Sequence, residues 1–148
     1  MYLNEKQSEA MALLATLDPV SQAAATVTTG WVDQSLFFAV MAVIQTGVLG
    51  AGATVDAKIQ QATDSGGTGV KDVTGKSITQ IVKASGDNKQ AVINLKEADL
   101  DTEGGFRWVR LSLTVGTAAS LVSAQLWGCL PRFMSAAGSN QAGVVQVV

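Results

Sequence analysis

Residues 53–60 have the sequence ATVDAKIQ, with apolar side chains at the odd positions and polar ones at the even positions. Successive side chains of a β-strand point to opposite faces, so this alternation predicts a strand with one buried face and one solvated face. This is the clearest local signal in the chain, and the surrounding segments are interpreted outward from it.

Further segments of strand character follow on both sides, separated by Gly, Asn and Asp. The stretch 36–46 is almost continuously apolar and predicts a strand buried on both faces, with a buried helix as the alternative that periodicity leaves open. β-Type residues or alternation also occur at 70–74, 78–83, 90–96, 106–115 and 121–130. A short connector joins the last two segments, and we expect them to form an antiparallel hairpin that ends at Pro131.

About seven short strands without helices between them predict an all-β fold, an antiparallel β-sandwich. The N-terminus differs, because Ala10, Met11, Leu13, Leu14 and Leu17 recur at helix-like spacing before Asp18-Pro19. We therefore expect an N-terminal helix or arm with a connector over 1–28. The sandwich domain is predicted over 29–134, and a C-terminal tail over 135–148.

The composition argues against catalysis. The chain has no His, one Cys and only 15% charged residues, which leaves little for acid–base, metal or thiol chemistry. We expect no enzyme, no catalytic or metal-binding residues and no cofactor, with Cys129 a small buried apolar residue. The acidic segment 99–104 resembles the start of a calcium loop, but Arg110 stands where the closing Glu is needed. A solvated acidic turn is expected there, with weak Ca²⁺ binding left open.

The charge distribution limits the possible partners. The net charge is −2 and basic residues are scattered, so we expect no nucleic-acid partner. The uncharged stretch 34–55 is long enough to span a membrane, but Gly and Gln interrupt it and basic anchors are lacking, so no membrane association is expected. So few charges predict that a partner covers some apolar surface.

Candidate contact residues lie near both ends of the chain and at two tryptophans. Leu13, Leu14 and Leu17 form an apolar stripe, which could pack on a partner or on the chain's own core. The tail residues Val144, Val145 and Val147 could be loose, or could form a strand lent to a neighbour. Trp31 and Trp108, with Trp127, could stack on sugars, although packing in a core or interface is the ordinary role of Trp.

Several segments together resemble a known family. They are Thr29–Asp33, Gly50–Lys58, Gln60–Asp64, Thr74–Gln80 and Phe106–Leu111. This pattern of strands and loops, over about two-thirds of the chain, resembles the auxiliary head proteins of tailed bacteriophages. The first 28 and the last 15 residues lie outside it.

The resemblance implies a jelly-roll sandwich that acts as a capsid decoration or cement protein, with no catalytic residues. Such a protein binds the outside of the shell and stabilises it. The implied partners are the major capsid protein and further copies of the chain, in a dimer or trimer. The implied location is the virion surface, after synthesis in the bacterial cytoplasm. The alternative function is a carbohydrate-binding sandwich or a head-surface adhesin, with a glycan as the partner.

Overall fold

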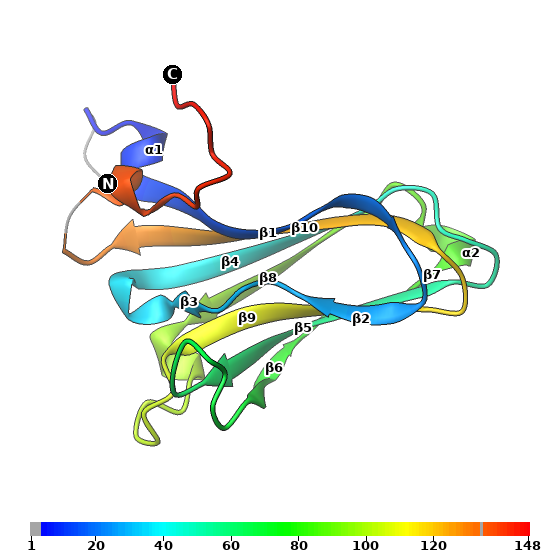
Figure 1. Ribbon diagram of the computed structural model, residues 1–148, viewed down its shortest axis with the longest axis horizontal. Coiled ribbons are helices and arrows are strands. Elements are labelled where there is room, and N and C mark those ends of the chain that lie inside the picture. The colour runs from blue at the N-terminus through cyan, green and yellow to red at the C-terminus, as the bar shows by residue number, and fades with distance from the viewer. Residues whose placement is uncertain (1–3, 134) are drawn as a thin grey trace.

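The computed structural model describes residues 4–133 and 135–148, which form two β-sheets packed face to face (Figure 1). The four-stranded sheet has the order β1 (Met11–Gln22), β10 (Ser120–Pro131), β4 (Phe37–Thr46), β8 (Gln90–Lys96). The second sheet has the order β2 (Ala25–Thr28), β9 (Trp108–Gly116), β5 (Thr54–Ala62), β6 (Lys71–Ser77). Short β3 (Val32–Asp33) pairs with β9, and β7 (Ile81–Val82) pairs with β5. The predicted antiparallel sandwich is confirmed.

The topology is that of a jelly roll. The eight long strands pair antiparallel in a nested series, β1 with β10, β2 with β9, β4 with β8 and β5 with β6. Such a series is one long hairpin rolled so that successive strands alternate between two sheets. Short helical turns lie at the strand ends: α1 (Gln7–Ala10), η1 (Gln34–Leu36), α2 (Lys83–Gly86), η2 (Glu97–Asp99) and η3 (Ala136–Ser139).

The predicted hairpin of residues 106–115 and 121–130 is wrong. These segments form β9 and β10, which lie in opposite sheets, with β9 between β2 and β5 and β10 between β1 and β4. Thr117, with a φ of 69°, lies in the connection that carries the chain across the sandwich. A hairpin and a sheet-crossing connection both reverse the chain between alternating strands, so local alternation cannot distinguish them.

The expected N-terminal helix is present but has only one turn, and the stripe assigned to it lies in β1. Ala12 and Ala15 are buried three residues apart, because a register irregularity between Leu13 and Ala15 shifts the strand's alternation. A β-bulge places an extra residue in one strand, and here it produces a three-residue spacing that mimics a helix.

Residues 11–28, which the sequence pattern separated from the sandwich as an arm and connector, supply β1 and β2. Pro19 lies within β1, where the register shifts again between Leu17 and Val20. Because Pro cannot donate to a ladder, an irregularity in an edge strand is where a sheet tolerates it.

The core lies between the sheets. It is built from the inward positions of the long strands, among them Val40, Ile44, Ile59, Leu111 and Leu126, all at most 1% exposed. A smaller cluster of Ala12, Phe37 and Ala136 joins β1, β4 and η3 at the end of the sandwich where α1 and the C-terminal tail lie (Figure 1). This second cluster fixes the point from which the tail leaves the domain.

Candidate functional site

The outer face of the four-stranded sheet is largely apolar, apart from the polar row Ser123–Gln45–Gln90 toward one end. Three rows of paired residues cross it, and we call them together the apolar face: Leu13–Trp127–Met41–Asn94, Thr16–Gln125–Val43–Val92 and Met11–Cys129–Ala39–Lys96. Lys96, at one edge, is the one charged residue in these rows. Apolar residues without interspersed charge on a solvent-facing sheet are typical of interaction surfaces.

β4 shows how this face arises. The continuous apolar run at 36–46 predicted burial on both faces, but the chain buries only one. Val40, Ala42 and Ile44 are in the core, whereas Met41 and Val43 are half-buried and point outward. The prediction of burial on both faces is therefore wrong for the single chain, because residues 4–133 and 135–148 cover the outward side chains of β4 only in part.

The outer face of the second sheet is polar and internally paired. Lys58 forms an ion pair of 2.7 Å with Asp72, Gln60 donates to Asp72 at 3.0 Å, and Arg110 donates to Gln60 at 3.0 Å. The Arg110 guanidinium also stacks on the Trp31 ring, 4.5 Å from its centroid. We call these five residues the polar network. The two outer faces of the sandwich thus have opposite chemistry.

The contribution of the polar network to the free energy of unfolding depends on pH through Asp72. Hydrogen bonds from Lys58 and then Gln60 hold the pKa of Asp72 below its usual value of 3.8. A carboxylate whose pKa is lowered by folding stabilises the fold above the unfolded-state pKa, and this stabilisation is lost as pH falls through the folded-state value.

We therefore expect Asp72→Asn to lower the free energy of unfolding at pH 7, with the difference from wild type disappearing as pH falls below the folded-state pKa of Asp72. Lys58 and Asp72 side chains are 43% and 52% exposed, so solvent screening limits the effect to about 0.5–1 kcal/mol. Urea unfolding from pH 2 to 7 measures it, with Glu103→Gln in an exposed loop as the control. A constant difference across this range would contradict the assignment.

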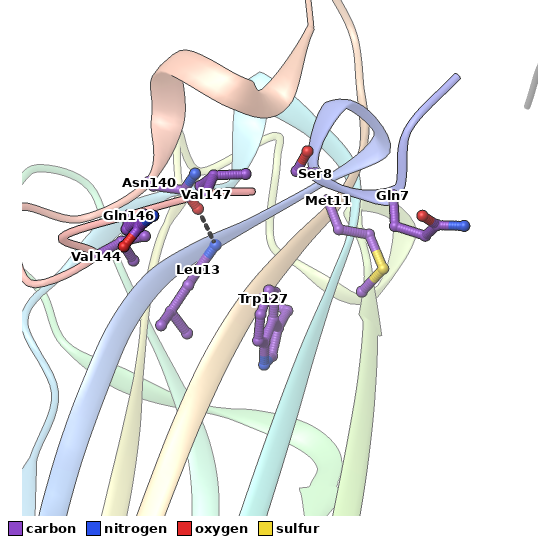
Figure 2. A pocket seen from close by; sticks show the side chains of 9 residues that line it. All are labelled: Gln7, Ser8, Met11, Leu13, Trp127, Asn140, Val144, Gln146 and Val147. Carbon is purple, nitrogen blue, oxygen red and sulfur yellow. Dashed lines mark hydrogen bonds between the residues drawn. The ribbon is translucent and has the colours of Figure 1, made fainter. Parts of the chain in front are cut away.

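A groove runs along the edge of the apolar face. It has a volume of about 470 Å³ and is lined by Gln7, Ser8, Met11, Leu13, Trp127, Asn140, Val144, Gln146 and Val147. We call it the tail groove. Figure 2 shows Met11, Leu13 and Trp127 on the adjacent strands β1 and β10, with the C-terminal segment beside them. The groove therefore joins the apolar face to the tail.

The start of the tail is fixed to β1. The Leu13 N–H donates to Asn140 Oδ1 at 2.8 Å, and the Gln141 N–H donates to the Leu13 carbonyl at 2.8 Å (Figure 2 draws the first). The Gln141 side chain donates to Thr16 Oγ1 at 3.2 Å. Both backbone groups of Leu13 at the bulge are thus satisfied by the C-terminal segment, which covers this part of the exposed strand edge.

The structure separates the predicted contact residues into three groups. Leu13, Val144 and Val147 meet in the tail groove, and Val145 nearby is 95% exposed. Leu14 and Leu17 instead pack against the core, which is the alternative that the sequence left open for the stripe. Trp108 begins β9 of the second sheet, and Trp31 directly precedes β3, which pairs with β9, so Trp127, on the other sheet, cannot share a platform with them.

The Trp31 ring packs against neighbouring residues and is only half-exposed to solvent. Arg110 covers its ring, and a Cβ at Gly67, whose φ is 85°, would lie only 2.7 Å from Trp31 Nε1. Met41, Val43 and Val92 were not among the predicted contact residues, and Trp127 was considered only together with Trp31 and Trp108 for stacking on sugars. The two-sided apolar pattern of 36–46 was the signal that could have found this face.

The acidic loop and the cysteine have local roles. Asp99 pairs with Lys76 at 3.0 Å, and Asp101 accepts from the Gly104 N–H at 3.0 Å while pairing with Lys71. Within residues 4–133 and 135–148, no three His, Cys, Asp or Glu side chains gather into a possible metal site. Cys129 is half-buried on the apolar face rather than fully buried, and desolvation raises the pKa of its thiol.

No helix among the described residues has the length and hydropathy to cross a bilayer.

No comparison with known families, proteins or structures assigns this chain to a family. No family model matches the chain, and no curated protein matches it in sequence. Similar solved structures include a Bacillus endospore appendage pilus subunit, with 15% identity, coverage of 88% of this chain and 99% of that one, and a TM-score of 0.37. A xylan-binding domain of a Paenibacillus barcinonensis xylanase has 12% identity, coverage of 82% and 87%, and a TM-score of 0.41. A chain of broad bean stain virus has 14% identity, coverage of 76% and 59%, and a TM-score of 0.39.

At these identities and TM-scores, the likenesses carry no argument about function. The chain is an antiparallel β-sandwich of jelly-roll topology with one apolar and one polar outer face.

Proposed function

We propose that this chain is a non-enzymatic structural protein that binds the outside of a tailed-phage capsid and stabilises the shell. The apolar face is the capsid-binding surface in this proposal. The observation that carries it is the contrast between the two outer faces, since the cores of protein interfaces are depleted in charged residues. The resemblance of the sequence to auxiliary head proteins is the reason for proposing the major capsid protein as the partner.

The apolar run of β4 supports the same proposal. Residues 36–46 have the pattern of a strand buried on both sides, and a capsid subunit on the apolar face would cover the outward side chains of Met41 and Val43. Removing apolar surface from water contributes roughly 25 cal/mol per Å², so a modest patch per copy provides a real but limited affinity. Many copies on one lattice can act together, provided that neighbouring sites are bridged.

In this proposal the sandwich binds to the shell as a rigid body through its apolar face. The polar network stays in water, and the protein is located on the virion surface after synthesis in the host cytoplasm. The stabilisation adds to the contacts between capsid subunits and opposes the internal pressure of packaged DNA. Adhesion of this kind requires no bond making or breaking by the chain.

Binding to shells tests the proposal. We expect Val92→Lys, on exposed edge strand β8, to weaken co-sedimentation with undecorated expanded shells from the same source by about tenfold or more, because it places an unpaired charge in the contact. Thr26→Lys is the matched control. It introduces the same residue at an exposed position of an edge strand, β2, but on the polar side of the sandwich.

Saturable binding of the wild type, with an unaffected Thr26→Lys and a weakened Val92→Lys, is the expected result. Absence of wild-type binding to expanded shells would overturn the function. Equal effects of both substitutions would leave the shell as the partner but move the contact away from the apolar face.

A glycan-binding role is the second candidate, and the polar side of the sandwich is the observation that favours it. A hollow of about 270 Å³ there is lined by polar groups of Asp56, Lys58, Ser77, Ser112 and Thr114, with Ala57 and Ile78. Such hollows can orient sugar hydroxyl groups through hydrogen bonds. Isothermal titration calorimetry with soluble glycans tests it, with Asp56→Ala removing a carboxylate that lines the hollow. Binding heat that Asp56→Ala abolishes would support this role, and no heat with the wild type would exclude it for the glycans tested.

A further inference from the structure

The last five residues, Val144–Val148, are apolar but mostly exposed. Val145 and Val148 are almost fully in water, and Val147 is 56% exposed, while Val144 is half-buried. The Val144 N–H donates to the Gln141 carbonyl at 3.0 Å, so the chain turns just after its anchor on Leu13. The segment is anchored on Leu13 through Asn140 and Gln141, yet its valines are exposed. Their contact with water is unfavourable, and a partner surface would remove it.

The tail groove matches this segment in its chemistry. Met11, Leu13 and Trp127 provide its apolar wall, and Val144 and Val147 of the same chain touch only part of it, leaving about 470 Å³ open. The segment V-V-Q-V-V carries no charge, no Pro and no Gly, and its β-branched residues favour an extended conformation. Groove and segment are therefore complementary surfaces carried by one chain.

The edge of the four-stranded sheet offers a second point of attachment. β1 is an edge strand, and the C-terminal segment satisfies the backbone groups of Leu13 alone. Unpaired strand edges favour the addition of a further strand from another chain. Residues 142–148 span roughly 25 Å when fully extended.

From this arrangement we propose that the chain self-associates by exchanging C-terminal segments, so that Val144–Val148 of one copy occupies the tail groove of a second copy. The exchange keeps the apolar contacts that Val144 and Val147 make within one chain. Val145 and Val148, exposed in the single chain, are the further apolar side chains available to fill the open part of the groove. Exchange of an identical element between copies is a low-cost route to oligomers, because the contacts already exist in the monomer. The inference goes beyond shell binding, because it concerns the protein alone.

Disulfide trapping between two differently sized proteins tests the exchange directly. Both carry Cys129→Ser; one also carries Leu13→Cys, and the other, extended by a mass tag, carries Val147→Cys. After mixing and mild oxidation, we expect a covalent heterodimer on a non-reducing gel. The control replaces Leu13→Cys with Val82→Cys, an exposed position on β7 at the opposite end of the sandwich, and should give little heterodimer (Figure 1). Met11→Cys provides a second position in the groove if Leu13→Cys lowers the yield of folded protein.

A chain that ends at Gln141 supplies the second measurement, since it retains the anchor on Leu13 and lacks the exchanged segment. We expect the full chain to form oligomers in sedimentation equilibrium, and the shortened chain to associate at least tenfold more weakly, with an unchanged far-UV circular dichroism spectrum. A full chain that stays monomeric at all concentrations would overturn the proposal. So would oligomers that persist after truncation, or a double variant Leu13→Cys/Val147→Cys that closes only within one chain. None of these outcomes requires capsid shells, so each is separate from the test of the proposed function.

Discussion

Replacing Phe37 with alanine is expected to lower the free energy of unfolding by about 3–5 kcal/mol, the usual cost of removing a buried phenyl ring. Phe37 is 1% exposed and lies under Gly128, where a Cβ would be only 2.8 Å from its ring. With Ala12 and Ala136 it joins β1, β4, β10 and η3. The cavity cannot be filled by small neighbours, so Tm should fall by roughly 10 °C in a chain of this length.

Phe38 provides the matched control for this prediction. It is the next residue, it is 54% exposed, and the Arg132 guanidinium lies over its ring, 4.5 Å from the centroid. Phe38→Ala should cost about 1 kcal/mol or less, since an exposed cation–π contact contributes little. Thermal and urea unfolding of both variants measure the difference. Equal effects would show that the ring of Phe37 is not a core element.

Replacing Thr29 with valine is expected to cost about 1–3 kcal/mol, because it removes the partner of a buried backbone amide. Thr29 is 4% exposed and lies between β2 and β3, where β9 would otherwise lack a neighbour. Its Oγ1 accepts from the Leu111 N–H at 3.0 Å, and its N–H donates to the Leu111 carbonyl at 3.0 Å. Valine has nearly the same shape, so the lost hydrogen bond dominates the effect.

Hydrogen exchange separates this explanation from a general loss of stability. The Leu111 amide should exchange faster in Thr29→Val under conditions where amides at the centre of the four-stranded sheet keep their protection. Thr28→Val is the control, since Thr28 is exposed, and its effect should stay within about 0.5 kcal/mol. Unchanged exchange of the Leu111 amide would contradict the role assigned to the Thr29 hydroxyl.

The fold class could be predicted from the sequence because alternation is a local property of a strand. β5 follows the pattern of residues 53–60 closely, with Val55, Ala57 and Ile59 inward. The same property failed at β1, where a bulge between Leu13 and Ala15 changes the period and imitates a helix. A bulge depends on the partner strand, and the amino-acid pattern of one segment does not record it.

The candidate site was predicted only in part. Leu13, Val144 and Val147 were selected as apolar residues near the ends of the chain, and the structure brings them together in the tail groove. Leu14 and Leu17 have the same character, yet they contact the core, because the bulge in β1 decides which side chains turn inward. Trp127 and Met41 become neighbours only through the pairing of β10 with β4.

The sequence by itself determined that this protein is built of strands, that its charges are few and scattered, and that residues 36–46 carry apolar side chains on both faces of one strand. These are consequences of side-chain type and two-residue periodicity, which act within one segment. Only the tertiary structure decided which sheet each strand joins, so that β9 and β10 face each other across the core instead of pairing. It also decided that one apolar side of β4 became core and the other an outer face. The sheet that each strand joins and the face that it buries depend on contacts between segments far apart in the chain. The jelly-roll topology determines these contacts.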